Sequence, residues 1–420
     1  MNDNSTDFDV LVVGAGPAGS SAATVLAKHG RRVALLEKES FPRYHVGESM
    51  IPHCWHALDR LGVADRMDDS GFVVTKHSVQ FVSTAGNRSK PFYFFQHDPH
   101  PSSKTWQVVR SEFDTLLRDN ALEQGVTYFD RTAAKELLRD ETGKVSGVTA
   151  EGPDGERIDL HATVTVDASG RDLFSSSKNK WRVADEKLNK VAVWTYFVGA
   201  KRDPGLDYGA TTVAYLPNKG WFWYLPLAND HTSVGIVADA DYLFRDTRDL
   251  KEILEREIQA QPWIAEHVAP ACCTQEFHVT RDFSYRSRHC AEDGLVLVGD
   301  AFAFLDPVFS SGMFFALHGG VMVADAVHTA LEKGDVSGTA FEEYGERFCN
   351  IIEPMRNLVH AFYDPEFSFA GFFKDNPDTR VDVTDVLVGN LERGFKELFD
   401  SMKQHAEIPA PLTHGRARVG

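Results

Sequence analysis

The sequence FDVLVVGAGPAG at residues 8–19 is the strongest indication of the fold of this chain. Its first half, residues 8–13, is an almost wholly apolar run of the kind that forms a buried parallel strand. Gly14, Gly16 and Gly19 then follow with G-x-G-x-x-G spacing. The first glycine permits a tight turn, the second lets a pyrophosphate approach the backbone, and the third lets helix and strand pack closely. We therefore expect a strand–turn–helix unit that binds a dinucleotide.

The residues after the turn complete a β–α–β unit. Small and apolar residues predict a helix that ends at Gly30, and residues 33–36 (VALL) predict a second buried strand. Glu37 follows that strand, 23 residues after Gly14. At this position a carboxylate accepts hydrogen bonds from the ribose hydroxyls of adenosine, so that FAD and NAD both fit the unit.

Hydrophobic periodicity beyond the first unit predicts an α/β chain with a β-rich second part and a helical end. Residues 190–240 are rich in β-branched and aromatic residues, which favours an antiparallel sheet. We expect helices at 58–67, 112–123, 249–260 and from Gly312, mostly helical structure at 340–403, and strands within 74–95, 126–138, 144–150, 162–166 and 294–298.

Size and charge narrow the classes of function. A chain of 420 residues is too long for one ordinary core and indicates two or three units. With 44 Lys and Arg against 61 Asp and Glu, the net charge of −17 disfavours nucleic acid and anionic membranes as partners. A small organic substrate, or a protein partner that tolerates an acidic surface, fits such a surface better.

Cysteine usage and apolar runs predict a cytoplasmic protein without a membrane span. The five cysteines are odd in number and lack C-x-x-C spacing, so neither a disulfide framework nor a zinc site is indicated. Residues 1–7 are polar and acidic, unlike a signal peptide. The apolar stretch at 301–323 contains Asp306, Pro307 and several glycines, which favours a buried helix over a membrane span.

Three later motifs distinguish FAD from NAD. They are RYHVGES at 43–49, VTVDASG at 164–170 and GLVLVGDAFAFLD at 294–306. Together with the first unit they resemble the FAD-binding fold of the glutathione-reductase class, in its para-hydroxybenzoate-hydroxylase-like branch. In that branch the aspartate of the G-D pair bonds the ribityl chain and ribose, a role that the resemblance gives to Asp300. Arg110 matches an arginine near the flavin, although a charge capping a surface helix is the alternative.

The resemblance implies FAD-binding residues and a domain plan. The FAD-binding residues are Gly14, Gly16, Ala18, Gly19, Glu37, Lys38, Arg43, Gly47, Glu48, Ser49, Arg110, Asp167, Gly299, Asp300, Pro307, Gly312 and Met313. The FAD-binding Rossmann domain is expected to be discontinuous, at 1–75, 105–180 and 285–330. An inserted antiparallel β-sheet forms a substrate domain at 76–104 and 181–284, followed by a helical C-terminal region at 331–407 and a loose tail at 408–420.

Two motifs narrow the resemblance to flavin-dependent halogenases. WFWYLP at 221–226 matches W-x-W-x-[IL]-P, and FLDPVFSSG at 304–312 matches F-x-x-P-x-x-S-x-G. The likeness is clearest up to the helical C-terminal region. Its signature residues are Trp221, Trp223, Pro226 and Ser310. The resemblance implies that the tryptophans wall the space near the flavin, although side chains that alternate along a strand also fit ordinary core packing.

This resemblance implies a reaction between reduced FAD, O2 and a halide ion. A separate flavin reductase supplies the reduced FAD, chloride or bromide is oxidised to hypohalous acid, and a lysine delivers the halogen to an aromatic substrate. The halide is expected at the backbone of Ser311 and Gly312, because free N–H groups at a helix start bind anions. The same turn also fits a flavin contact in a relative that does not halogenate.

Lys76 is the candidate for the catalytic lysine. In the family the pattern is close to K-x-G-x-x-F, and this chain has Lys76 and Phe81 with Ser78 in place of the glycine. A catalytic Lys76 is expected to be partly buried, which lowers the pKa of its amine. The alternative is a solvated lysine at a strand edge.

Phe309 distinguishes the chain from tryptophan halogenases, which carry a glutamate just before the serine of the S-x-G turn. That glutamate helps to position the lysine and the arene, so its absence argues against free tryptophan as the substrate. The sequence DPVFSSG resembles the corresponding motif of halogenases that act on phenols and pyrroles, many of which use substrates tethered to a carrier protein. Aromatic residues such as Phe362, Phe367 and Phe373 line the substrate cavity or serve packing.

Other functions fit parts of the same pattern. A flavin hydroxylase or a geranylgeranyl-reductase-like enzyme shares the GES and DASG wording, and a FAD-binding protein without catalysis keeps only the cofactor site. The chain shows no second G-x-G-x-x-G after a strand for NAD(P)H, which favours an external reductase. A halogenase requires halide and O2, a hydroxylase adds oxygen without halide, and a reductase works without O2.

Overall fold

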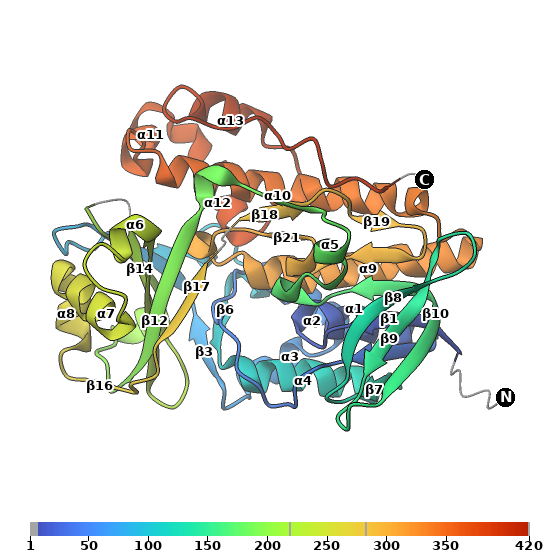
Figure 1. Ribbon diagram of the computed structural model, residues 1–420. Coiled ribbons are helices and arrows are strands. Elements are labelled where there is room, and N and C mark those ends of the chain that lie inside the picture. Colours follow the sequence, from blue (N-terminus) through green and yellow to red (C-terminus); the bar gives the residue numbers. More distant parts are fainter. Residues whose placement is uncertain (1–6, 218–219, 282–283, 419–420) are drawn as a thin grey trace.

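The structure is a computed structural model that describes residues 7–217, 220–281 and 284–418, and its first unit is the expected nucleotide-binding fold (Figure 1). The sheet has the strand order β19-β20-β10-β1-β2-β7, with a β8–β9 hairpin joined to β10. β20, β10, β1, β2 and β7 run parallel to one another. The strands are β1 (Asp7–Val13), β2 (Val33–Leu36), β7 (Thr127–Phe129), β8 (Ala133–Arg139), β9 (Val145–Glu151), β10 (Arg157–Asp167), β19 (Ala291–Glu292) and β20 (Leu295–Leu297). The glutathione-reductase-type α/β architecture is thereby confirmed.

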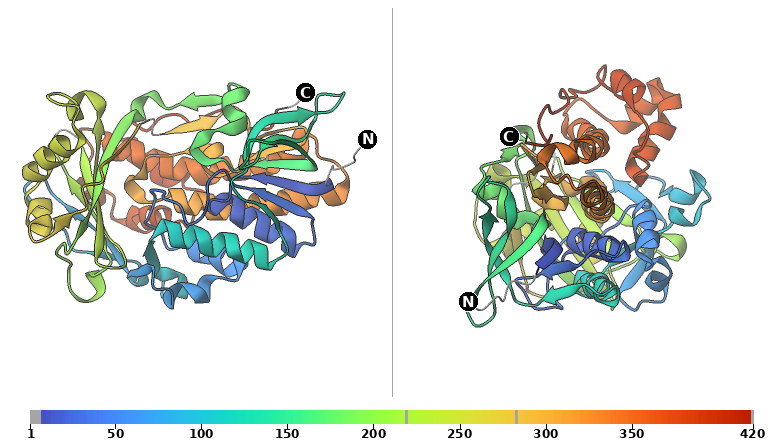
Figure 2. Two further views of the ribbon diagram at one scale, coloured as in Figure 1. Left: turned by 60° about the horizontal axis from the view of Figure 1, so that its bottom comes forward. Right: turned by 90° about the vertical axis from the view of Figure 1, so that its right-hand side faces the viewer.

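Alternate residues of β1 belong to two different cores, because neighbouring side chains of a strand point to opposite faces. Val10 and Val12 pack with α1 (Pro17–Lys28), α4 (Arg110–Glu123) and α9 (Gly312–Lys333). Leu11 and Val13 pack with residues of the β8–β9 hairpin. In the right-hand view of Figure 2, α9 (orange), α1 (blue) and α4 (teal) form a column along one face of the strands.

The predicted helix at 58–67 is two helices. α2 (Cys54–Leu61) ends at Gly62, whose φ of +81° is left-handed, and α3 (Ala64–Asp68) follows. A glycine in this conformation ends a helix. The prediction of one helix followed the continuous apolar periodicity and did not take account of Gly62.

The second unit is a sheet with the strand order β16-β12-β15-β14-β13-β4-β5, and β17 also pairs with β12. The strands are β4 (Ser78–Val82), β5 (Phe92–Tyr93), β12 (Lys190–Val198), β13 (Thr211–Tyr215), β14 (Trp221–Pro226), β15 (His231–Asp239), β16 (Cys272–Cys273) and β17 (His278–Arg281). All neighbours are antiparallel except β4 and β13, which run parallel. The expectation of a wholly antiparallel sheet is wrong at this pair, because the long connection through the FAD-binding unit leaves the direction of β4 free of any hairpin constraint.

The two faces of this second sheet have different neighbours. Its outer face is covered by α6 (Ala240–Leu243), α7 (Leu250–Ala260) and α8 (Pro262–Val268). Its inner face presents Trp194, Trp221 and Trp223 to the first unit. The inner face is therefore the side on which a bound cofactor meets this sheet.

Two small sheets join the units. β3 (Val73–Lys76) pairs with β6 (Thr105–Val108), beside the domain limits expected at 75/76 and 104/105. β11 (Arg182–Ala184), expected in the substrate sheet, instead pairs with β18 (Tyr285–Ser287), which pairs with β21 (Ala303–Phe304). Its short link to α5 (Phe174–Lys178) keeps β11 near the first unit. The division of the chain into domains stays a proposal.

The C-terminal region is helical, as expected, and lies along α9 at the top of Figure 1. Its helices are α10 (Glu342–Tyr363), α11 (Phe369–Asp375), α12 (Arg380–Val388) and α13 (Lys396–Met402). By length and composition α9 is one helix that could cross a membrane, but it packs against α1, α2 and α10 inside the fold.

The expectation of a loose tail at 408–420 is wrong for the residues up to Arg418. The Cys290 N–H donates to Arg416 O over 3.1 Å, and the Arg418 N–H donates to Ala291 O over 2.7 Å. β19 is the edge strand of the parallel sheet, and an edge strand offers unpaired backbone groups that a passing segment satisfies. Residues 419–420 lie outside the described part of the chain.

Candidate active site

A cavity of about 690 Å³ lies between the parallel sheet, the glycine-rich turn and the inner face of the second sheet. It gathers most of the residues singled out in the sequence. The predicted residues that line it are Gly14, Gly16, Ala18, Glu37, Lys38, Arg43, Gly47, Glu48, Ser49, Arg110, Trp221, Trp223, Asp300, Pro307, Ser310, Gly312 and Met313. Motifs separated by up to three hundred residues in the sequence therefore border one site.

The glycine-rich turn has the geometry that its spacing predicts. Gly14 has φ +101°, and a Cβ there would lie 2.5 Å from Ala168 O. A Cβ on Gly19 would lie 1.8 Å from Gly14 O, so Gly19 permits the close packing of helix and turn and does not line the cavity. The backbone at Gly16 is open on the cavity side and begins α1, whose first N–H groups are free to bind an anion.

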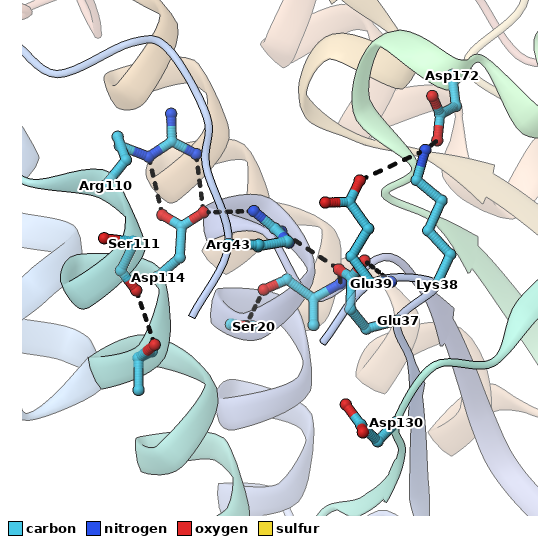
Figure 3. Close-up of polar contacts among 12 residues, drawn as sticks. Ser20, Glu37, Lys38, Glu39, Arg43, Arg110, Ser111, Asp114, Asp130 and Asp172 are labelled. Atoms are coloured by element: carbon cyan, nitrogen blue, oxygen red, sulfur yellow. Dashed lines mark hydrogen bonds and ion pairs between the residues drawn. The ribbon is translucent and has the colours of Figure 1, made fainter. Parts of the chain in front are cut away.

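Two arginines and a buried aspartate hold the next part of the wall (Figure 3). Arg43 donates to Glu37 Oε2 over 3.2 Å and to Asp114 Oδ2 over 3.0 Å. Arg110 forms a two-pronged ion pair with Asp114 over 2.8 and 2.9 Å and donates to the carbonyl oxygens of Val46 and Gly47. Arg110 thus shapes the loop before Glu48, in addition to lining the cavity. Asp114, fully buried, was missed because its role depends on two partners distant in sequence.

The carboxylate of Glu37 is buried at the end of β2. It accepts the Ala15 N–H over 3.1 Å and the Glu39 N–H over 3.0 Å, besides the bond from Arg43. Lys38 is half exposed and pairs with Asp172 over 2.5 Å. These contacts place Glu37 at the rim of the glycine-rich turn, where the adenosine ribose is expected.

The aspartates of the two later motifs have different surroundings. Asp300 faces the cavity, and burial raises the pKa of its carboxyl to about 6. Asp167 is fully buried outside the cavity, where it accepts the backbone N–H groups of Ser169 and Ser175 over 3.0 and 2.8 Å. In contrast to the expected FAD contact, Asp167 holds the turn after β10 and does not line the cavity. Gly299, with φ +60°, likewise shapes the turn without lining the cavity.

Tryptophans from two strands form the opposite wall. Trp221 and Trp223 on β14 line the cavity together with Trp194 on β12, and the rings of Trp194 and Trp223 lie 6.1 Å apart. The indole N–H of Trp223 donates to Ser233 Oγ over 3.0 Å. Pro226 ends β14 and does not line the cavity. Trp194 was missed because no motif marks it.

The turn before α9 brings Ser310 and Gly312 to the cavity. Ser310 has φ +57°, a left-handed conformation that is uncommon outside glycine, and Ser311 is the buried N-cap of α9. The first N–H groups of this long helix lack intrahelical partners, so that the turn is suited to an anion.

A hydrogen-bonded triad buttresses this turn. Asp306 accepts the Val308 N–H over 3.1 Å and the hydroxyl of Tyr363, on α10, over 2.9 Å. The indole N–H of Trp221 donates to the same hydroxyl over 2.8 Å. Burial raises the pKa of Asp306 to about 6, and the bond from Tyr363 opposes that rise. Tyr363 was missed because nothing local links a C-terminal helix to this turn.

Lys76 is buried at the end of β3, with only 2% of the residue exposed. Its amine donates to Ser49 Oγ and to Met50 O, both over 2.9 Å. Burial lowers the pKa of Lys76 to about 7. The amine does not line the cavity itself and reaches it through Ser49, which does. The expectation of a buried lysine with a lowered pKa agrees with this geometry, and the solvated strand edge does not.

The residues present fit FAD. Arg43 Nε and Glu48 Oε2 are buried and have no hydrogen-bond partner within the described part of the chain, although both residues line the cavity. The cavity extends from the glycine-rich turn to the tryptophan wall, and its lining includes Thr132–Lys135 and Leu173, which no motif marks. A long ligand with an anionic centre and a flat aromatic end matches this arrangement of donors, carboxylates and rings.

Comparisons with known proteins find flavin-dependent halogenases, as the residues of the site lead us to expect. The sequence profile of the tryptophan halogenase family matches residues 9–98 and 96–374. A 1H-pyrrole-2-carbonyl-[peptidyl-carrier protein] brominase of Pseudoalteromonas luteoviolacea is 32% identical over 91% of this chain and 92% of the relative. The flavin-dependent halogenase armH3 of Armillaria mellea is 34% identical over 94% of this chain and 79% of the relative.

Solved structures show the same relationship. The flavin-dependent brominase Bmp2 superposes with a TM-score of 0.86 at 27% identity, covering 95% of this chain and 100% of that one. The myxobacterial chondrochloren halogenase CndH gives a TM-score of 0.80 at 31% identity, covering 95% and 96%. The chain therefore belongs to the family of FAD-dependent halogenases.

Proposed function

We propose that this chain uses reduced FAD, O2 and chloride or bromide to halogenate an electron-rich aromatic ring, a pyrrole or a phenol, presented on a carrier protein. The observation that carries the proposal is the buried amine of Lys76, bonded to Ser49 on the wall of the cavity that also contains Gly312. A buried amine with a lowered pKa, bonded to the wall of a cavity that the start of α9 also borders, fits halogen transfer better than it fits hydroxylation or reduction.

Individual residues have defined places in the proposal. Gly14, Gly16 and Ala18 would hold the pyrophosphate, Glu37 the adenosine ribose and Asp300 the ribityl chain. When bound and reduced, the flavin supplies the electrons that activate O2 and so permit oxidation of a halide. The N–H groups of Ser311 and Gly312 would hold the halide at the start of α9.

Lys76 and its surroundings control the transfer. With a pKa of about 7, the side chain exists both as amine and as ammonium near neutral pH. The ammonium can hydrogen-bond a hypohalous acid, and the free amine can accept a halogen. Ser49 fixes the position of the amine and is itself within 3.1 Å of the Thr211 hydroxyl.

The surroundings of Phe309 support a ring other than free tryptophan. Phe309 is buried where tryptophan halogenases carry a glutamate, and its ring lies 5.8 Å from that of Phe362 on α10. The ring of Phe369 lies 6.3 Å from that of Phe309. These contacts make Phe309 and Phe362 part of the apolar packing behind the turn, and Phe309 offers no carboxylate there to position an indole, which suits a pyrrole or phenol that is already electron-rich.

Partners follow from the same proposal. A separate flavin reductase supplies reduced FAD, and a carrier protein presents the ring, as the name of the Pseudoalteromonas luteoviolacea relative states for that enzyme. All five cysteines are free thiols in the structure, which supports the proposed cytoplasmic location.

The test is a reaction with omissions. Purified chain, a flavin reductase, NADH, FAD and bromide are incubated with free and carrier-bound pyrroles and phenols, and products are identified by mass spectrometry. We expect a halogenated product that disappears when bromide, chloride and other halides, O2 or the reductase is left out. An oxygenated product without halide would establish a hydroxylase instead, and reduction without O2 would establish a reductase.

A further inference from the structure

A row of hydrogen-bonded side chains connects the protein surface to the cavity. The indole N–H of Trp194 donates to the Tyr44 hydroxyl over 2.7 Å, the hydroxyls of Tyr44 and Tyr196 lie 2.9 Å apart, and Tyr196 donates to Glu48 Oε1 over 2.8 Å. Tyr44 is 48% exposed, whereas Glu48 is 5% exposed and lines the cavity. Tyr44 is therefore the solvent end of the row and Glu48 is its end at the cavity, while Trp194, which is buried and also lines the cavity, only donates to Tyr44.

The direction of every bond in the row follows from its ends. An indole N–H can only donate, so the Tyr44 oxygen accepts and its own proton is free to point to Tyr196. An ionised carboxylate can only accept, so Tyr196 directs its proton to Glu48. The bonds thus point the same way, which is the arrangement that a proton transfer toward Glu48 requires.

The far oxygen of Glu48 has no partner among the described residues. Glu48 Oε2 is buried and makes no hydrogen bond, although the residue borders the cavity. The groups that face Glu48 are Tyr196 on β12, Ser233 on β15 and Arg110 on α4, and burial raises the pKa of Glu48 to about 7 against their effect. His278, on β17, stacks on Tyr44 with the rings 4.7 Å apart.

The overall chemistry consumes a proton. Halogenation balances as FADH2 + O2 + X⁻ + ArH + H⁺ → FAD + ArX + 2 H2O, where the C–H bond breaks and the C–X bond forms. The competing loss of peroxide, FADH2 + O2 → FAD + H2O2, consumes no net proton. A buried site thus needs a proton path for the first reaction and not for the second.

We propose that Glu48, supplied through Tyr196 and Tyr44, delivers to the cavity the proton that each halogenation consumes. This inference rests on the proposed function. Glu48 gives up its proton at Oε2 and regains one at Oε1 from Tyr196, which takes its own from Tyr44 and so from solvent. Tyr196 and Tyr44 are relay residues that need not touch the substrate.

The first test measures how reduced FAD is divided between halogenated product and H2O2. Tyr196→Phe, Tyr44→Phe and Glu48→Gln are expected to lower the ratio of product to H2O2 about tenfold or more, most strongly at high pH, because general-acid steps contribute roughly 10²–10⁴ in rate. Tyr224→Phe is the matched control, since its hydroxyl donates to Lys201 O on the outer side of the same sheet.

Structural damage has a different signature. A variant that merely binds FAD poorly makes less product and less H2O2 together, leaving their ratio unchanged. Because Tyr44 is exposed, Tyr44→Phe is expected to fold normally and tests the relay even if the variants at buried residues do not fold. An unchanged ratio in both Tyr44→Phe and Tyr196→Phe, with FAD affinity like that of the wild type, would overturn the relay.

The second test needs no catalysis. Infrared spectroscopy of the FAD-free protein follows the carboxylic acid band that Glu48→Gln removes. Tyr196→Phe is expected to move the titration of that band to higher pH, because it removes a hydrogen bond that favours the charged carboxylate. If Tyr196→Phe does not move the titration of the Glu48 band, the relay is contradicted. If the wild type halogenates nothing, the proposed function is contradicted, and the infrared titration can still be measured.

Discussion

The amine of Lys76 lies 2.9 Å from the Ser49 hydroxyl and 2.9 Å from the Met50 carbonyl oxygen, and it makes no ion pair within the described residues. Two neutral acceptors satisfy part of its hydrogen-bonding capacity, but they do not compensate the cost of burying a charge. The fold therefore favours the neutral amine, which agrees with the proposal that this lysine serves near neutral pH both as hydrogen-bond donor and as acceptor of a halogen.

Replacing this amine should stabilise the protein in acid. An unfolded lysine stays protonated up to its ordinary pKa of about 10.5, while folded Lys76 loses its proton near pH 7. Between these values the unfolded chain binds more protons, so the stability contributed by Lys76 rises with pH. Lys76→Met should raise the melting temperature at pH 6, with a gain that shrinks as the pH approaches 10. A gain independent of pH, judged against the exposed-site variant Lys90→Met, would contradict this account.

Asp114 is the buried counterion for two arginines of the cofactor wall. Asp114→Asn removes the carboxylate that pairs with Arg110 and leaves Arg43 with Glu37 as its remaining carboxylate partner among the described residues. Breaking a buried ion pair on one side typically costs about 3 kcal/mol. We expect a lower denaturation midpoint for the FAD-free protein and FAD binding weakened about tenfold. Asp119→Asn on the same helix is the control, because Asp119 is 47% exposed and such ion pairs contribute little. Equal behaviour of the two variants would show that Asp114 does not organise the site.

Among the helices and strands, α10 supports the active site in a way that no pattern in its own sequence indicates. Tyr363, at the last turn of α10, accepts from Trp221 of β14 and donates to Asp306 before α9. Three elements from distant parts of the chain thereby meet at one hydroxyl. The C-terminal region, which lies beyond the family motifs, therefore supports the turn before α9, where we propose that the halide binds.

Removing this hydroxyl should weaken halide use more than catalysis itself. Tyr363→Phe leaves Asp306 with one acceptor site unfilled and raises its pKa above about 6. A hydrogen bond to a charged group contributes about 1.5–3 kcal/mol, part of which holds the turn, so we expect KM for bromide to rise about tenfold with a smaller change in kcat. The acid limb of the pH profile should move to higher pH. Tyr215→Phe serves as control, and identical effects of both variants on KM would refute the role.

Local patterns predicted the elements that depend on neighbours in sequence. The turn at Gly14–Gly19 follows from spacing alone, since a Cβ at Gly19 would clash with Gly14 O whatever the rest of the chain does. Burial of Lys76 was also predictable, because its position in a family pattern reports on its environment. The parallel β4–β13 pair, by contrast, depends on a connection that passes through another unit, and no local signal encodes its direction.

Side-chain partners were beyond prediction for the same reason. The bonds of Asp114, Tyr196 and Tyr363 join residues many positions apart, and single-sequence patterns carry no information on such pairs. Asp167 illustrates the reverse error. Its motif resembles a cofactor contact, but backbone N–H groups of the following turn, rather than the cavity, occupy its carboxylate.

At the scale of the whole molecule, the cavity lies where three parts of the chain meet. The parallel sheet contributes the glycine-rich turn, the second sheet contributes the tryptophan wall, and the first residue of α9, Gly312, also lines the cavity. Lys76 is at the end of β3, between the two sheets, and almost wholly buried. Under the proposed function, a small ring on a carrier would have to approach this buried amine from outside the protein.

Carrier attachment should therefore matter for rate. Contacts with the remote carrier can supply binding energy that orients the ring at the buried amine. We expect kcat/KM for a carrier-bound ring to exceed that for the same free carboxylic acid by about tenfold or more. Steady-state assays on the two forms at equal bromide concentration check this. Equal values would show that the chain acts on free aromatics.

In the proposed reaction the halogen reaches the ring through Lys76. The direct measurement is the mass spectrum of a carrier-bound pyrrole after reaction with bromide, reductase and O2, for the wild type, Lys76→Ala and the exposed-lysine control Lys90→Ala. We expect the isotope doublet of bromine with the wild type and with Lys90→Ala, and its loss in Lys76→Ala although FAD still binds and bromide is still oxidised. A Lys76→Ala variant that brominates the ring as the wild type does would contradict it.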